Sequence, residues 1–549
     1  MSSGTCLKAS AADWHMGNQS SKRIQRIKDE SHVQSILNQW SNEEQRLLKK
    51  PFILDSDVDR GTSTLHLISH SITKRLLLNF CQLHLPMTFE IRLAEAFALY
   101  LCPNGQDDAA KEERLVFRDY LDMVQSFMYG TTLATGEALR PVDAFVRLFC
   151  LLTAKKGVSL TTFMSWVVKT GVNLWYEGTE ITFIDYDRNK EQRDRLVKTL
   201  LIAFLDDPVA DEFADDEQAA DKKKDDDIHA WLSLATAEPF PVDDSDNVLA
   251  LTTWMEKTPD FVVLMKIVAR CYFLGPVRLN ANHHSIDTTA GNVAALDQDT
   301  LHRYRLARLL APRLAEPFLL LTAYDFYYIS LSLPPRSLSW SAAEQTQLKQ
   351  AQPLQFQRIF DSRSDGSSWQ VFAHQLVKHP GSTLLIIRTK EAKAVFGGYI
   401  EEPWEPVTDW YGSPSNFLFR VSATGRAHDR LGTWLGTSIN NHYQYLCWGK
   451  KSMGGQFDYA GLWLHENFTH GYSRAGPLCS TYQSPKLCQE DPFEIDQVEV
   501  WLLRPTVKEE EDQAPGSSVL DRAEEMQFLE MAGKKLYSKD LEKPEKEPQ

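Results

Sequence analysis

The sequence predicts an α+β protein: a helical first half, then an antiparallel β-sandwich with flanking helices and a final helix. Apolar residues recur at intervals of three and four between about residues 30 and 335. Short β-rich runs separated by Gly, Pro, Asn and Asp begin near Ser382. The composition, 43% hydrophobic and 24% charged over 549 residues, is that of a globular chain. At ~100–200 residues per domain, this length allows roughly two to four domains.

Charge and cysteine content exclude several classes of protein. The chain has 59 Lys+Arg and 74 Asp+Glu, a net charge of −15, which argues against a nucleic-acid partner. Its 8 cysteines form no CxxC pair, as expected in a reducing compartment such as the cytoplasm. The first fifteen residues lack the apolar core of a secretory signal. The apolar run 318–333 contains Asp325 and is shorter than the ~20 residues that span a membrane, so we expect a buried helix there.

The N-terminal segment, residues 1–29, carries a possible lipid attachment site. Met16-Gly17-Asn18-Gln19-Ser20-Ser21 matches the N-myristoylation pattern, with Gly17 as the acceptor. Fifteen residues precede Met16, so either Met16 is the true start or the lipid is absent; a chance match is the alternative. A single myristoyl chain binds membranes weakly, and a basic patch is the usual second signal. Such a patch follows the motif at Lys22, Arg23, Arg26 and Lys28.

Residues 30–335 form the predicted helical, EF-hand-like region. Met, Leu or aromatic stripes at helical spacing are usually core, and the segments 87–101 and 141–152 follow this pattern. The acidic run 206–227 is interpreted as a flexible insertion, and 280–299 as a polar break. The clearest apolar stripe consists of Val33, Ile36, Leu37 and Trp40.

One segment begins like an EF-hand calcium loop. Asp185, Asp187 and Asn189 provide oxygens at loop positions one, three and five. Position six should be Gly and position twelve Glu, but these are Lys190 and Leu196. Without that turn and that carboxylate the oxygen cage cannot close. We therefore expect an EF-hand-like scaffold that has lost its metal.

The β-rich runs of the second half predict an antiparallel sandwich. Breaks at Glu402-Pro403 and Ser413-Pro414 separate some of them, and Gly454-Gly455 suggests a turn with positive φ or a close backbone approach. The runs are 383–388, 394–400, 416–421, 443–449, 461–464 and 497–502.

None of the catalytic or metal-binding patterns is complete. Gly471–Ala475 approximates a nucleophile elbow around Ser473, but that elbow requires a parallel sheet, so a turn serine is expected. The spacings of His465 with His470, and of Cys479 with Cys488, do not fit zinc. Residues 449–452 lack the upstream glycine of a phosphate-binding loop. We expect no catalytic residue, no metal and no cofactor.

Several separated motifs of the second half, in one order, resemble the TLDc domain family over about residues 340–505. They include 396–399, 453–456, 461–464, 470–473 and 498–501. The residues to which the resemblance assigns the motif are Gly397, Gly398, Trp404, Gly412, Phe417, Phe419, Gly454, Gly455, Gly461, Trp463, Gly471, Ser473 and Glu499.

Within that family the chain resembles the myristoylated, mTOR-associated type. This resemblance implies a non-enzymatic adaptor or regulator at the cytoplasmic face of the lysosomal membrane and in the cytoplasm. It implies that the protein supports mTOR signalling and binds V-ATPase subunits through the TLDc domain and a C-terminal helix. Membrane contact would use the myristate and the basic patch. The alternative is an oxidation-resistance type of TLDc protein that uses Cys447 or Cys479.

The C-terminal sequence predicts a linker at 506–517, a helix at 518–538 and a disordered tail at 539–549. Ser518 and Asp521 form a Ser-x-x-Asp capping pattern. An apolar stripe at helical spacing suits either a helix that binds a partner's groove or one that folds back on the sandwich. The stripe consists of Val519, Ala523, Met526 and Leu529.

Overall fold

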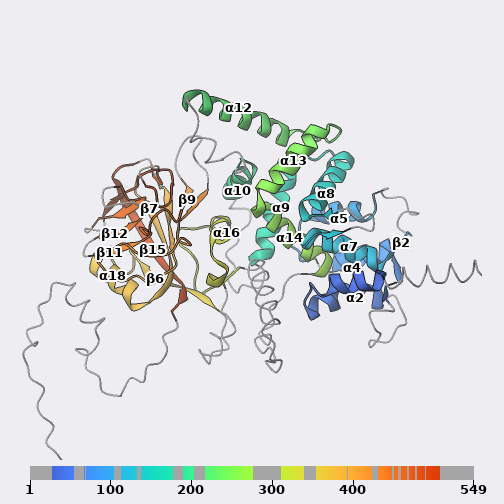
Figure 1. The fold of residues 1–549 in the computed structure, drawn as a ribbon, viewed down its shortest axis with the longest axis horizontal. Helices are drawn as coiled ribbons and strands as arrows, with labels where there is room; N and C mark the ends of the chain where they lie inside the picture. Colours follow the sequence, from blue (N-terminus) through green and yellow to red (C-terminus); the bar gives the residue numbers. More distant parts are fainter. Residues whose placement is uncertain are drawn as a thin grey trace, which may run out of the picture. The chain divides into compact units, whose positions relative to one another are not determined.

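The protein divides into two units (Figure 1). Residues 1–177 and 200–279 form the first, and residues 178–199 and 280–549 the second. No helix within the described ranges has the length and apolarity needed to span a bilayer. The computed structural model describes residues 28–54, 67–68, 70–83, 85–103, 113–132, 138–176, 190–202, 217–275, 311–338, 354–391, 393–422, 431–447, 450–454, 459–465, 469–476, 479–488 and 490–506.

The first unit is helical, as the sequence predicts. Residues 28–37 form its first helix, and the stripe of Val33, Ile36, Leu37 and Trp40 is buried. The further helices of this unit are α2 (Asn42–Leu54), α4 (Lys74–Leu83), α5 (Ile91–Leu101), α7 (Phe117–Met128), α8 (Pro141–Lys156), α9 (Leu160–Tyr176), α12 (Glu217–Thr236), α13 (Ser245–Lys257) and α14 (Pro259–Leu274).

Two helix–strand–helix elements pair near the start of this unit. Strand β1 (Ser71–Thr73) lies between α2 and α4, and β2 (Arg114–Val116) lies between α5 and α7. The two strands pair antiparallel, with Ile72 opposite Leu115. This is the connectivity of paired EF-hands. In the segment that begins like a calcium loop, the residues from Lys190 onward belong to α10 (Lys190–Ile202), so loop positions six to twelve are helical; Asp185, Asp187 and Asn189 lie outside the described residues.

A buried ion pair joins α2 to α14. The Arg270 side chain is 7% exposed and that of Glu44 5%. Arg270 donates from Nε and Nη2 to Glu44 Oε1 at 3.3 and 3.2 Å, and from Nη1 to the Gly275 carbonyl at 3.2 Å. Glu44 also accepts a hydrogen bond from the Ser41 hydroxyl at 3.0 Å. Every charged group here is hydrogen-bonded, the condition under which a buried ion pair is tolerated.

The acidic run 206–227 is not a loop throughout, contrary to the sequence prediction. Residues 217–227 form the first part of α12. Ala219, Ala220 and Lys222–Lys224 are strong helix formers, and this preference prevails over the charge of the segment.

The second unit is built on an 11-stranded, mostly antiparallel sheet that folds into two layers. Its main path has the order β10-β9-β8-β7-β15-β14-β13-β12-β11, and β6 pairs with β15 and β5. The long strand β15 continues from one layer into the other. The strands are β5 (Arg313–Leu314), β6 (Gln355–Asp361), β7 (Gly381–Thr389), β8 (Val395–Ile400), β9 (Phe417–Ser422), β10 (Gly432–Leu435), β11 (Tyr445–Cys447), β12 (Lys450–Met453), β13 (Leu462–Leu464), β14 (His470–Tyr472) and β15 (Phe493–Pro505).

Both faces of the β7–β8–β15 region are buried. On one face, Leu385, Phe396 and Val500 pack against Met453 and Leu464 of the other layer. Helix α18 (Trp369–Lys378) contributes to that same core. Helix α16 (Ala323–Ser332) packs against β9 and β10. The α+β class predicted from the sequence is confirmed.

Three details of this unit differ from the prediction. The pair β5–β6 is parallel, with Leu314 opposite Phe356, so the sandwich is not entirely antiparallel. Strand β6 precedes residue 382, where the sequence places the first strand. Helix α16, which the sequence analysis assigns to the helical region, belongs to the second unit, because its apolar side chains pack on this sheet.

Candidate functional site

The motif glycines of β8 are required by close packing on both faces of the strand. A Cβ added at Gly397 would lie 1.8 Å from the Leu385 carbonyl oxygen and 2.9 Å from the Phe419 ring. A Cβ added at Gly398 would lie 2.4 Å from Met453 of the opposite layer. Gly398 allows the two layers to approach, and Gly397 allows β8 to pack closely against β7 and Phe419 of its own layer, so the role of both is in the fold.

The other described glycines of the motif lie in turns and strands that meet aromatic or backbone neighbours. Gly454 and Gly412 have φ values of +75° and +112°, which favour glycine. A Cβ on Gly454 would also approach the Tyr482 ring at 2.4 Å. Gly461 and Gly471 face the Leu418 side chain and the Trp463 carbonyl, respectively.

The aromatic motif residues are core residues. Phe417 and Phe419 are fully buried, and Trp404 and Trp463 are 2% and 7% exposed. Trp404 Nε1 donates to Thr383 Oγ1 at 2.9 Å, which satisfies its only polar group. Trp404 belongs to the core between the layers, whereas Phe417 and Phe419 lie on the face of β9 opposite the core residue Leu418. The motif aromatics are thus buried, but they do not converge on one site.

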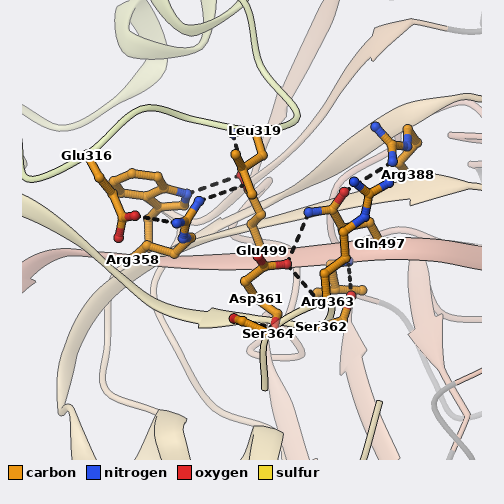
Figure 2. Close-up of polar contacts among 12 residues, drawn as sticks. Glu316, Leu319, Arg358, Asp361, Ser362, Arg363, Ser364, Arg388, Gln497 and Glu499 are labelled. Carbon is orange, nitrogen blue, oxygen red and sulfur yellow. Dashed lines mark hydrogen bonds and ion pairs between the residues drawn. The ribbon is translucent and has the colours of Figure 1, made fainter. Parts of the chain in front are cut away.

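Glu499 is the one ionisable motif residue, and it lies at the centre of a buried polar network (Figure 2). Strand alternation places Val498 and Val500 in the core between the layers, so Glu499 points to the opposite face. Its Oε1 accepts a hydrogen bond from the Leu319 backbone N–H at 2.9 Å, and its Oε2 accepts one from Trp501 Nε1 at 3.3 Å.

Arg358 lies between two carboxylates, as Figure 2 shows. Its Nη1 is 3.5 Å from Glu499 Oε1, and its Nη2 donates to Glu316. Burial raises the pKa of the Glu499 carboxyl, while the bonds from Leu319 and Trp501 and the charge of Arg358 oppose that rise. The network therefore fastens the segment after β5 onto β15.

A second set of contacts continues from Gln497 along the same strand. Gln497 Nε2 donates to Asp361 Oδ1 at 3.0 Å, and its Oε1 accepts from Arg388 Nη2 at 3.1 Å. Arg388 Nε donates to Asp496 Oδ2 at 2.7 Å. Figure 2 shows Arg388 and Asp361 on either side of Gln497. Sequence reasoning missed these partners, although a Gln and a Glu within an otherwise apolar strand were a signal.

Ser473 directly follows β14, and its hydroxyl is used in structural hydrogen bonds. It is 1% exposed. Its hydroxyl donates to the Gly461 carbonyl at 2.7 Å and accepts from the Leu487 N–H at 3.0 Å. Within the described residues no base lies next to it, and β14 belongs to an antiparallel layer. The hydroxyl ties two loops together.

The candidate thiols and imidazoles are in structural positions. Cys479 and Cys488 are 0% and 2% exposed. Burial raises the pKa of the Cys479 thiol, which disfavours the reactive thiolate. The His465 and His470 rings stack with their centroids 4.5 Å apart. The described residues contain no group of three His, Cys, Asp or Glu side chains arranged to hold a metal ion.

The first unit has a hollow of about 400 Å³, lined in part by His32, Gln39, Gln125 and Thr131. Its polar groups are engaged with one another. His32 Nε2 lies 2.6 Å from Asp122 Oδ1, and Gln125 Nε2 donates to Gln39 Oε1 at 2.9 Å. This hollow contains none of the predicted site residues.

Other predicted site residues lie outside the described residues. They are the lipid acceptor Gly17, the motif residue Gly455 and the apolar stripe Val519, Ala523, Met526 and Leu529. Their assignments stay predictions.

Comparisons with known proteins agree with the motif reading. The zebrafish (Danio rerio) protein named MTOR-associated protein MEAK7 is 35% identical over 196 residues, which cover 34% of this chain and 42% of the relative. The human protein of that name is 34% identical over 204 residues, covering 36% and 42%. The bovine (Bos taurus) Oxidation resistance protein 1 is 22% identical over 196 residues, covering 35% and 19%.

The matches to these relatives span less than half of each relative's length. Residues 316–504 match the family model of the TLDc domain. That range contains the glycine-rich β8, the Glu499 network and all motif residues named above. Residues 316–504 of this chain are therefore a TLDc domain.

Proposed function

We propose that this protein is a non-enzymatic adaptor that supports mTOR signalling at the lysosome and binds the V-ATPase through its TLDc domain and C-terminal helix. The observation that carries the proposal is the match of the TLDc region to proteins named as mTOR-associated, at 34–35% identity in human and zebrafish. The oxidation-resistance relative is more distant, at 22% identity over 196 residues.

The roles of the motif residues support a function carried by the surface. Gly398 is used in packing the two layers, and Gly397, Phe417 and Phe419 are buried on the other face of the same strands. The polar atoms of Glu499 are used to hold the segment around Leu319. When the motif residues of a domain are used for packing, its binding surfaces are formed by its loops and exposed strand ends.

Membrane attachment is part of the proposal. A chain that starts at Met16 would expose Gly17 for myristoylation, and Lys22, Arg23, Arg26 and Lys28 would add attraction to anionic lipids. Mass spectrometry of the N-terminal peptide from cells tests this. A peptide that begins at Ser2, without any species acylated at Gly17, would remove the anchor.

Capture of V-ATPase head subunits from lysosomal membranes tests the pump interaction. The full chain is compared with a chain that ends at Thr506, because β15 extends to Pro505 and the Thr506 N–H donates to the Pro380 carbonyl. We expect the full chain to retain the pump subunits and the shorter chain to retain them less. If neither retains them, the pump interaction is wrong; equal retention makes the C-terminal helix dispensable.

The second candidate is protection against oxidative stress, which the oxidation-resistance relative suggests. It predicts that cells expressing Cys447→Ser or Cys479→Ser lose peroxide resistance while pump binding is unchanged. The raised pKa of the buried Cys479 thiol weighs against that residue as the reactive group.

A further inference from the structure

Two large apolar side chains are exposed at the end of edge strand β10. Leu435 is 53% exposed and Ile439 62% exposed. The β10 tip, defined here as residues 435–439, also contains Ser438. An exposed Leu and Ile in one short segment is a candidate contact surface.

The β10 tip is held in place by the segment around Ser480. The Thr437 N–H donates to the Thr481 carbonyl at 2.8 Å, and its hydroxyl donates to the Ser480 carbonyl at 2.9 Å. Asn440 Nδ2 donates to Ser480 Oγ at 3.0 Å. Ser438 has a φ of +59°, in the left-handed region that disfavours residues other than glycine. Such strain persists where the surroundings impose it, and it often marks contact sites.

The chain leaves the sheet at the same end as the β10 tip. Strands β15, β8 and β10 run in the same direction, because each neighbouring pair along β15-β7-β8-β9-β10 is antiparallel. Strand β10 therefore ends, at Leu435, at the same end of the sheet as β15, and the β10 tip begins there. Four strand spacings of ~4.8 Å place the two exits about 19 Å apart. One row of paired residues crosses the five strands: Trp501, Leu384, Tyr399, Phe417 and Leu435.

The following sequence has the length to cross that distance. Val519 lies fourteen positions after Pro505, with thirteen residues between them. A flexible chain of that length has a root-mean-square end-to-end distance of about 20 Å. Effective concentration is highest when the length of a linker matches its span. The root-mean-square length of the linker thus matches the distance to the β10 tip, which gives the apolar stripe of residues 519–529 close to the highest effective concentration there.

We propose that residues 519–529 dock on the β10 tip of the same chain, with the stripe of Val519, Ala523, Met526 and Leu529 against Leu435 and Ile439. Docking would cover the exposed pair and withhold the stripe from any other partner. A partner that binds the stripe must first displace it, so the β10 tip acts as a competing internal site. This docking does not depend on the proposed function.

Cross-linking in the full chain tests the docking directly. The pair Ile439→Cys with Met526→Cys is treated with a short bis-maleimide, and wild type measures the background from native cysteines. The matched control is Val371→Cys with Met526→Cys, since Val371 is 37% exposed on α18 of the same unit. We expect the first pair to cross-link at least tenfold faster and to give a monomeric product. Equal rates, or a dimeric product, would overturn the proposal.

Hydrogen exchange at the β10 tip gives an independent test. Met526→Glu with Leu529→Glu places charges in the stripe, and Gln527→Glu adds a charge beside it. We expect the double variant to speed amide exchange across residues 435–441 about tenfold and Gln527→Glu to leave it unchanged. Unchanged β7 exchange would show that the sandwich is intact. Wild-type exchange in the double variant, or equal acceleration by Gln527→Glu, contradicts the docking.

Discussion

Removal of the Glu499 carboxylate tests whether the buried network holds the TLDc domain together. Glu499→Ala leaves the Leu319 N–H and the Trp501 indole N–H without their acceptor. It also leaves Arg358 with one carboxylate partner, Glu316, where wild type has two. Each buried donor left without a partner costs about 1–3 kcal/mol. Leu319 is 49% exposed and the Trp501 bond is long at 3.3 Å, so the lower values apply. With the cavity left by the side chain, we expect a loss of about 3 kcal/mol.

Glu499→Gln separates the role of shape from that of charge. It keeps an acceptor for Leu319 but places an amide donor toward Trp501, so we expect a loss of about 1 kcal/mol. The matched control is Glu494→Ala on the same strand, because Glu494 is 61% exposed in its pair with Lys390 and such pairs contribute ~0–1 kcal/mol. Urea dependence of amide exchange in residues 381–389 and 493–505 reports on the second unit alone. A Glu499→Ala chain within 1 kcal/mol of wild type would refute this reasoning.

Three further predictions concern other parts of the molecule. Gly397→Ala should prevent the TLDc domain from folding, because the new Cβ would lie 1.8 Å from the Leu385 carbonyl oxygen. The control Gly366→Ala meets nothing within 4 Å and should cost about 1 kcal/mol, because alanine disfavours the left-handed φ of that position. Circular dichroism and soluble yield compare the two variants, and equal effects would contradict the packing argument. Arg270→Ala removes the ion-pair partner of the buried Glu44 carboxylate and should destabilise the first unit by about 3–5 kcal/mol in a denaturant titration. The exposed Arg140→Ala should cost less than about 1 kcal/mol, and similar losses for the two variants would show that burial of the pair does not matter. Burial raises the pKa of the Asp325 carboxyl, so the protonated side chain contributes stability below the ordinary pKa of aspartate, and this contribution is lost as pH rises through the raised value. We therefore expect the free energy of unfolding of wild type minus that of Asp325→Asn to be larger at pH 4 than at pH 7. A difference that does not depend on pH would contradict this prediction.

The sequence predicts those helices and strands whose own residues show the expected hydrophobic periodicity. Strands β7 and β8 are continuous apolar runs, so their existence could be predicted within a residue or two of the observed bounds. Strands β12 and β14 have the sequences KKSM and HGY, which carry no strand pattern. They are extended because neighbouring strands provide their hydrogen-bond partners. This is a tertiary effect, which the intrinsic β propensity of the residues does not capture.

The candidate site shows the same division. Glu499 and the motif glycines are both identified by the family resemblance. Its partners Arg358, Glu316 and Leu319 come from segments far from it in sequence and carry no motif. A single sequence does not show which charged side chains come into contact when β15 pairs with β6 and β7. The sequence predicts an EF-hand-like region but not strands β1 and β2, because both strands are short and each is stabilised by pairing with the other.

Strand β15 has a consequence for how the protein is made. It pairs with β14, β7 and β6, yet it is the last strand of the domain to leave the ribosome. Until it arrives, the nascent chain must carry the apolar faces of β7 and β8 without their central neighbour, and such faces attract chaperones and other nascent chains. A stop codon or a splicing change before Phe493 would therefore remove a ladder shared by both layers. The product would be an aggregation-prone polypeptide and not a shortened TLDc domain.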